Sequence, residues 1–325
     1  MRLAGLKVLI TGGAGFIGSN LVDALIKSNE VVVLDDLSSG KLENIAHHQH
    51  DERFTFIEGG LLDEKALSRA CNGVDIVFHL AANPEVRIGT QNTWVHIEQN
   101  VLTTHALLEQ MRKKRIKEVV FTSTSTVYGE AESIPTPESY GPLVPISIYG
   151  ASKLACEALI CAYCHSFNMR SWIFRFANIV GQRSEHGVIH DFVKKLMEEP
   201  SRLEVLGDGT QKKSYLYVRD CVDAILHSIE SSQESVNIFN IGSDDTTEVN
   251  RIAEVVVEKM GLEDVELRYV NKLDGRGWVG DVRHMLLSCE KLRKLGWVPN
   301  HSSEESVRCA VEDRLMEVGY WVGER

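Results

Sequence analysis

Short apolar runs alternate with amphipathic stretches through the first half of this chain. Six runs are rich in Val, Ile and Phe and are bounded by Gly, Asp or Asn, as is typical of strands covered on both faces. These predicted strands span 6–11, 31–35, 54–58, 75–81, 118–124 and 171–176. Helical spacing is found between them, at 16–28, 63–71, 92–113 and 148–167. The alternation predicts an α/β fold with a doubly wound parallel sheet and right-handed crossovers.

The pattern changes after about residue 180. Helical spacing continues at 188–198, 219–230, 247–260 and 302–318, and residues 203–218 predict two short strands around a Gly-rich turn. We therefore expect a larger domain over 1–180 and a smaller C-terminal α+β domain over 181–325. A chain of 325 residues exceeds the usual size of a single core, which agrees with two domains. The run at 237–242 has the pattern of a strand that returns to the main sheet.

Composition and charge narrow the class of protein. Apolar residues make up 43% and charged residues 25%, as in ordinary soluble globular proteins. The net charge of -11 argues against nucleic acid and anionic membranes as partners, because the long-range field repels phosphate. No apolar run approaches the roughly 20 residues of a membrane span, and the first residues lack the pattern of a signal peptide. We expect a cytoplasmic protein in which local cations bind any phosphorylated substrate.

The cysteines and a histidine cluster do not predict a metal site. Seven cysteines, an odd number, do not suggest a disulfide framework. Cys161 and Cys164 form a lone C-x-x-C within a predicted helix, where we expect them to pack as small apolar residues. His47, His48 and His50 lie in a polar connecting stretch with no carboxylate or cysteine at ligand spacing. We therefore expect a solvated loop there.

The first predicted strand runs into a glycine-rich turn that opens a helix. Gly12, Gly15 and Gly18 have the spacing G-x-x-G-x-x-G. Glycine allows the tight turn, the close approach of backbone to a pyrophosphate and the packing of helix on strand. The second strand ends in Asp35, whose carboxylate can accept hydrogen bonds from the adenosine ribose and would repel a 2′-phosphate. The pattern predicts NAD binding rather than NADP binding.

A second group of residues predicts proton-transfer chemistry. Tyr149 and Lys153 are four residues apart and share one face of a predicted helix. A nearby ammonium would stabilise the phenolate and lower the tyrosine pKa from about 10. The fifth strand ends in hydroxyl residues, one of which can relay the proton of a substrate oxygen. Side-chain alternation alone leaves Ser123, Thr124 and Ser125 open.

With these motifs in place, nearly the whole chain resembles the extended short-chain dehydrogenase/reductase family of NAD-dependent sugar epimerases and dehydratases. The motifs are TGGAGFIG (11–18), VLDDLSSG (33–40), HLAAN (79–83), the Asn-Val pair 100–101, TSTSTVYG (122–129), YGASK (149–153), RFANIVG (175–181), GDGTQKKSYLYVRD (207–220) and GDVRHMLLSCEKLRKLGW (280–297). The resemblance implies a Rossmann domain that binds NAD and a smaller domain that binds a nucleotide sugar.

The resemblance also implies site residues. It selects Thr124 as the catalytic hydroxyl beside Tyr149 and Lys153. The expected NAD-binding residues are Gly12, Gly15, Phe16, Ile17, Gly18, Asp35, Asp36, Leu37, Ser38, Ser39, Gly40, Gly60, Leu61, Leu80, Ala81, Ala82, Asn100, Thr122, Tyr149, Lys153 and Phe176. The expected substrate-binding residues are Val86, Thr124, Asn178, Val188, Lys213, Tyr215 and Arg276, with Arg183 as a rival for the diphosphate.

Some positions depart from the family pattern. Gly60 replaces the acid that often lies beside adenine, and Lys213 replaces an arginine that would bind phosphate through two parallel hydrogen bonds. Ser125 and Thr126 occupy the positions where 4,6-dehydratases carry Asp-Glu. These hydroxyls cannot drive the loss of water, so the resemblance is strongest to the UDP-glucose 4-epimerases.

The activity implied is epimerisation at C4 of a UDP-hexose through a transient 4-keto sugar, as between UDP-glucose and UDP-galactose in galactose metabolism. An epimerase for UDP-N-acetylhexosamine or UDP-uronic acid, a decarboxylase or a reductase stays an alternative, as does a non-catalytic NAD-binding regulator. Met285, near the expected gate of the sugar pocket, does not discriminate among them. The resemblance further implies a homodimer built on the helices 92–113 and 148–167.

Overall fold

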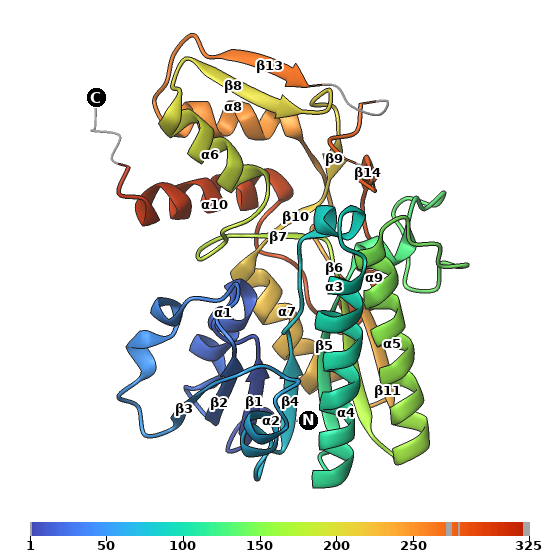
Figure 1. Cartoon of the computed structure of the whole chain (residues 1–325). Helices are drawn as coiled ribbons and strands as arrows, with labels where there is room; N and C mark the ends of the chain where they lie inside the picture. The colour runs from blue at the N-terminus through green and yellow to red at the C-terminus, as the bar shows by residue number, and fades with distance from the viewer. Residues whose placement is uncertain (1, 271–274, 279, 321–325) are drawn as a thin grey trace.

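A seven-stranded parallel sheet organises the larger part of the molecule (Figure 1). The computed structural model describes residues 2–270, 275–278 and 280–320. The strands are β1 (Lys7–Thr11), β2 (Glu30–Asp35), β3 (Phe54–Glu58), β4 (Ile76–His79), β5 (Glu118–Thr124), β6 (Arg170–Phe176) and β11 (Val236–Ile241). Their order is β3-β2-β1-β4-β5-β6-β11, and every pair is parallel. The predicted doubly wound α/β fold is confirmed.

Side chains alternate along the strands and pack into two apolar layers, one on each face of the sheet. Val8 and Ile10 of β1 pack with the helices α1 (Phe16–Leu25) and α7 (Val218–Ser231) on one face. Leu9 points to the other face, which is covered by α2 (Glu64–Ala70), α4 (Thr103–Lys114) and α5 (Ile148–Phe167). Cys161 and Cys164 of α5 pack in this second layer as free thiols. Both faces are apolar because helices cover both.

The predicted helix at 92–113 is interrupted. It begins as α3 (Trp94–His96), widens into the π-helix η4 (Ile97–Leu102) and continues as α4. The buried Asn100 lies in the π-helical turn, where its side chain accepts from the Asn83 backbone N–H at 2.8 Å and donates to the Ser152 hydroxyl at 2.9 Å. Apolar spacing did not reveal this local change of helix type.

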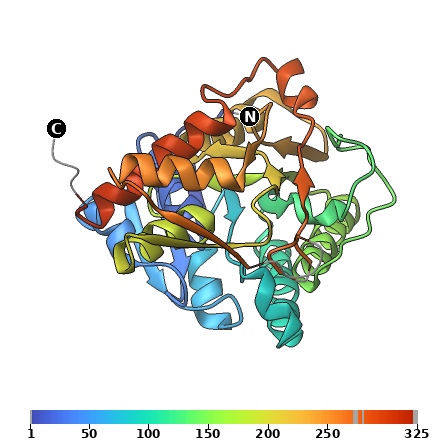
Figure 2. The same cartoon turned by 90° about the horizontal axis from the view of Figure 1, so that it is seen from above.

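The smaller lobe sits above the carboxyl ends of the sheet. It contains α6 (Val188–Glu198), α8 (Val249–Lys259), α10 (Ser303–Glu317) and the parallel pair β8 (Arg202–Leu206) and β13 (Glu266–Val270). Seen from above, α8 and α10 run side by side (Figure 2). The short α9 (Glu290–Lys294) packs near β11.

The second strand predicted within 203–218 is divided into β9 (Lys212–Lys213) and β10 (Tyr215–Tyr217). β10 pairs with β7 (Asn178–Val180), whereas β9 lies between β12 (Thr247–Glu248) and β14 (His284–Met285). Where the sequence suggested a returning strand at 237–242, β11 joins the main sheet beside β6. Among the described residues, no helix combines the length and apolarity that a membrane crossing requires.

Candidate active site

A pocket of about 630 Å³ lies where the carboxyl ends of the strands meet the smaller lobe. Polar loops gather at this edge of a doubly wound sheet, and ligands bind there. The predicted residues that line it are Gly12, Gly15, Phe16, Ile17, Gly18, Asp35, Asp36, Ser38, Ser39, Gly40, Leu61, Leu80, Ala81, Ala82, Val86, Thr122, Thr124, Tyr149, Lys153, Phe176, Asn178, Arg183, Val188, Lys213 and Tyr215. One cavity therefore joins the predicted dinucleotide, catalytic and sugar-nucleotide residues.

The glycine turn fits a pyrophosphate. Gly12 has a φ of +71°, and a Cβ there would lie 2.7 Å from the backbone nitrogen of Ala81. A Cβ at Gly18 would lie 2.1 Å from the Gly12 carbonyl oxygen, so the start of α1 could not pack as it does. Among the residues that the structure describes, a Cβ at Gly15 would have one such contact, at 3.3 Å, and no side chain caps α1 there. The free N–H groups of the helix therefore face an open cradle, as an anion requires.

Asp35 is held at the end of β2 by two backbone N–H groups. Its carboxylate oxygens accept from Ala14 and Leu37, each at 2.9 Å. Burial raises the pKa of Asp35 despite these hydrogen bonds. Each carboxylate oxygen has a second lone pair that can accept from a ribose hydroxyl. This geometry suits NAD and disfavours a 2′-phosphate.

Three expected cofactor residues lie outside the pocket lining. Leu37 packs against the apolar layer that contains Val8 and Ile10. Gly59, just after β3, lines the pocket in place of Gly60. Asn100 faces the loop after β4 from inside its helix and holds the backbone at Asn83. The sequence motifs placed these residues near the cofactor but did not show which way each one points.

Helix α5, which carries Tyr149 and Lys153, begins just before Tyr149. The Ser147 side chain caps it by accepting from the Gly150 N–H at 3.0 Å. Tyr149 lies beside Thr124, the last residue of β5, whose hydroxyl acts to lower the pKa of the Tyr149 phenol. Lys153, which is 3% exposed, donates from Nζ to the Thr122 carbonyl at 2.9 Å. Helix and strand thus bring the three predicted catalytic residues to one wall of the pocket.

The pKa of Tyr149 differs from the prediction. Burial raises it to about 12, which a hydrogen bond from Thr124 offsets only in part. Burial also lowers the pKa of Lys153 to about 8. The Lys153 ammonium is directed at the Thr122 carbonyl and is not among the groups that shift the tyrosine. We expected the nearby ammonium to lower the Tyr149 pKa; in this structure burial raises it instead.

A buried charged network lies one helical turn beyond Lys153, and the sequence analysis missed it. Glu157, one helical turn after Lys153, forms an ion pair with Arg175 of β6 at 2.7 Å. The Ser123 hydroxyl donates to Glu157, so this member of the hydroxyl cluster serves the network. Arg175 also donates to the Tyr128 hydroxyl at 3.0 Å. The i, i+4 spacing from Lys153 was the only signal for Glu157 in the sequence.

Of the three cations expected to bind the diphosphate, two line the pocket and one does not. Lys213 lines the pocket but pairs with Asp281 at 2.6 Å. Arg183 also lines the pocket, and its Nη1 is buried without a hydrogen-bond partner in the described parts of the chain. Arg276 lies outside the lining, where it donates to the Asp281 carbonyl at 2.6 Å and pairs with Glu130 at 2.5 Å. Met285 on β14 is outside the lining too.

The histidine stretch is not the solvated loop that we expected. His47 and His48 lie on the 3-10 helix η2 (Ala46–His48), and both imidazoles contact Asp23 of α1. The carboxylate comes from a segment more than 20 residues away, which is why sequence spacing did not reveal it.

Comparison with known proteins gives consistent matches along the chain. The NAD dependent epimerase/dehydratase family matches residues 8–242. A putative UDP-glucose 4-epimerase of Methanocaldococcus jannaschii is 34% identical over 94% of this chain and 97% of its own length. The crystal structure of a UDP-galactose 4-epimerase is 42% identical, with a TM-score of 0.85 over 97% of this chain and all of that one. A UDP-N-acetylglucosamine 4-epimerase from Methanobrevibacter ruminantium is 30% identical, with a TM-score of 0.86 over 97% of this chain and 99% of that one.

Proposed function

Because the chain belongs to the NAD-dependent epimerase/dehydratase family, we propose that it interconverts the C4 epimers of a UDP-hexose, UDP-glucose and UDP-galactose. The observation that carries the proposal is that Tyr149 and Thr124 line the same pocket as the glycine cradle. The similarity to 4-epimerases of UDP-sugars supports the same reaction type. In this proposal the enzyme acts in the cytoplasm, in galactose metabolism.

The residues after Thr124 argue against dehydration. Thr126 contacts Thr124 through its hydroxyl at 3.1 Å, and Ser125 precedes it. Elimination of water needs an acid and a base, and neither hydroxyl titrates near neutral pH. These side chains can orient a sugar hydroxyl without removing it.

The chain's own residues would hold the substrate and move one proton. When bound, NAD supplies the chemistry that removes a hydride from the sugar and returns it. Tyr149 takes the proton of the 4-hydroxyl, directly or through Thr124, and gives it back to the 4-keto sugar after that sugar has turned in the pocket. Lys153 donates to the Thr122 carbonyl and so holds the end of β5 beside Tyr149.

The diphosphate needs positive charge in this acidic protein. We place it between Arg183 and the N-terminus of α6, which begins at Val188. Asp281 already neutralises Lys213, whereas Asp23 pairs with Nη2 of Arg183 and leaves Nη1 without a partner among the described residues, which supports Arg183 over Lys213 and Arg276. A helix N-terminus and a guanidinium are both suited to phosphate oxygens.

We also propose a homodimer on the faces of α4 and α5, together with α3 and η4. Large apolar side chains are exposed on these elements: Trp94 (56%), Ile97 (37%), Leu102 (39%), Ile148 (37%) and Phe167 (37%). Exposed apolar patches of this kind often mark interfaces. Light scattering after size exclusion should give twice the chain mass, and Trp94→Glu should shift the mass to that of one chain.

The test of the activity is interconversion of UDP-galactose and UDP-glucose by purified enzyme without added NAD. Tyr149→Phe should abolish turnover while the protein keeps its fold and its bound NAD. Wild-type turnover in this variant, or no turnover of either sugar by the wild type, would overturn the proposal.

The second candidate substrate is UDP-N-acetylglucosamine, which the similarity to a 4-epimerase of that sugar supports. The same assay with UDP-N-acetylglucosamine and UDP-glucuronate identifies the preferred sugar by kcat/KM.

A further inference from the structure

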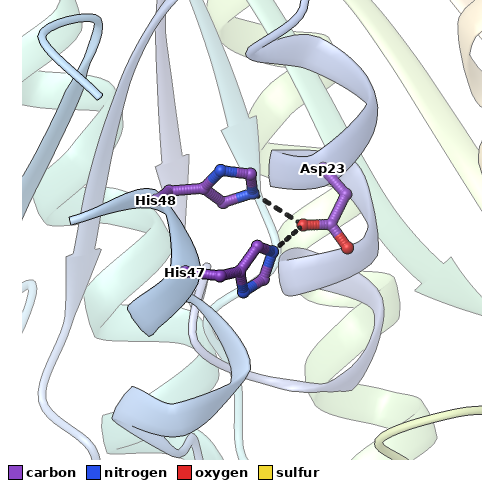
Figure 3. Close-up of side chains that lie close together, drawn as sticks. All are labelled: Asp23, His47 and His48. Carbon is purple, nitrogen blue, oxygen red and sulfur yellow. Dashed lines mark hydrogen bonds and ion pairs between the residues drawn. The ribbon is translucent and has the colours of Figure 1, made fainter. Parts of the chain in front are cut away.

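Three side chains with metal-binding atoms converge outside the active-site pocket. Asp23 comes from α1, and His47 and His48 come from the 3-10 helix η2, which lies between β2 and β3 in the chain. The Nε2 atoms of both histidines lie 2.7 Å from the same carboxylate oxygen, Oδ1. Figure 3 shows the two rings pointing at that oxygen from one side. The ligand atoms all lie within 4.8 Å of one another.

The fold holds these groups in place. The His48 side chain is 15% exposed and packs against Phe54, with ring centroids 5.8 Å apart. The His47 side chain is 48% exposed, so one side of the cluster is open to water. The second oxygen of Asp23, Oδ2, pairs with Nη2 of Arg183 at 2.8 Å. This ion pair orients the carboxylate and leaves Oδ1 for the imidazoles, as partners behind metal ligands commonly do.

We propose that Asp23, His47 and His48 form a site for a divalent transition-metal ion of the zinc type, with water as the fourth ligand. Two imidazoles and one carboxylate are a usual ligand set for such ions. Tetrahedral bonds of about 2.0–2.2 Å separate neighbouring ligand atoms by about 3.4 Å. Each nitrogen–oxygen contact of 2.7 Å must therefore lengthen by roughly 0.7 Å, within reach of side-chain rotation.

The chemistry of the cluster also selects the class of ion. Mg²⁺ and Ca²⁺ prefer oxygen ligands, and this cluster offers two nitrogens and one oxygen. Arg183 adds a positive charge beside the site, which weakens simple electrostatic attraction of any cation. Binding must then come from coordination by the imidazoles, which favours Zn²⁺, Co²⁺, Ni²⁺ and Cu²⁺.

The experiment uses the untagged full chain with its bound NAD, treated with a chelator and then titrated with ZnCl₂ by calorimetry. Co²⁺ serves as a spectroscopic probe. We expect one ion per chain and visible Co²⁺ bands without the sulfur charge-transfer band that cysteine ligands would produce. Asp23→Asn, His47→Gln and His48→Ala should each weaken binding at least about tenfold. The matched control is His50→Ala, a neighbouring histidine outside the cluster, which should bind as the wild type does.

The variants are chosen so that a loss of metal binding is not caused by a loss of the fold. His47→Gln changes a half-exposed side chain, and Asp23→Asn keeps the size and shape of the side chain. Circular dichroism and retained NAD verify that each variant is folded. The proposal is overturned if the wild type shows no saturable binding at micromolar Zn²⁺. It is equally overturned if the cluster variants bind as tightly as the wild type, or if the Co²⁺ complex carries the sulfur band.

Discussion

Replacing Lys153 by methionine should stabilise the cofactor-free protein near neutral pH although it removes a group of the proposed active site. Lys153 is 3% exposed, and burial lowers its pKa from 10.5 to about 8. At pH 7 the folded protein must hold a charged ammonium in a desolvated place, whereas the unfolded chain holds it in water. Methionine is similar in length, apolar and uncharged, so the folded protein no longer carries this cost.

The magnitude follows from the shift in pKa. A shift of about 2.5 units, at 1.36 kcal/mol each, corresponds to roughly 3 kcal/mol of destabilisation from Lys153. This destabilisation is fully present below the folded pKa of about 8. It falls as the pH rises from 8 towards 10.5, because the unfolded chain then binds a proton that the folded protein does not. Methionine also loses the hydrogen bond to the Thr122 carbonyl, worth about 1 kcal/mol. The net gain at pH 7 should be about 2 kcal/mol.

The assay is urea unfolding of cofactor-free wild type and Lys153→Met between pH 7 and 10.5. The variant should be the more stable protein at pH 7, and its advantage should shrink by about 3 kcal/mol across this range and end slightly negative. Lys113→Met, on the exposed side of α4, controls for the loss of a lysine charge. A stability difference that does not change with pH would refute the reasoning, since it would mean that Lys153 has the same pKa in both states.

Three further predictions concern the pocket and the buried ion pair of Arg175 and Glu157. Ultraviolet titration of the cofactor-free enzyme, with Tyr149→Phe subtracted, should show little phenolate from Tyr149 at pH 10, where an ordinary tyrosine is half ionised. Asp35→Asn should weaken NAD binding about tenfold or more and reduce the preference for NAD over NADP. Fluorescence titration with each cofactor measures both effects. Arg175→Met should destabilise the protein by about 3–5 kcal/mol in urea, because it leaves Glu157 buried without its partner. The double variant Arg175→Met with Glu157→Leu should recover most of that loss; equal stability of the single and double variants would contradict this account.

The sequence predicted the sheet and the cofactor cradle because their signals are local. Buried parallel strands are continuous apolar runs, and the glycine turn needs its residues within one short segment. Tyr149 and Lys153 follow from spacing on one helix. In each case the atoms that must meet are close along the chain, so a pattern of residue types is enough to place them.

What the sequence did not reveal depends on contacts between distant segments. Asp281 neutralises Lys213 from 68 residues away, and nothing near Lys213 signals it. Arg175 stood out only as part of a strand and of the motif RFANIVG, and its partner Glu157 only by its spacing from Lys153. The partners of Arg276 were equally hidden: it lies outside the pocket lining and contacts Asp281 and Glu130, although its position in the chain suggested phosphate binding.

The raised pKa of Tyr149 bears on how this residue would act as a base near neutral pH. A phenol with a pKa of about 12 is a weaker acid than free tyrosine, and the lysine beside it is itself shifted towards its neutral form. Further positive charge in the pocket is therefore needed before Tyr149 can act as a base near neutral pH. In the proposed mechanism this charge would come from bound NAD, whose oxidised nicotinamide ring is cationic and whose reduced ring is neutral. Bound NAD would then favour the Tyr149 phenolate when a proton is to be taken from the substrate, and the phenol when that proton is to be returned.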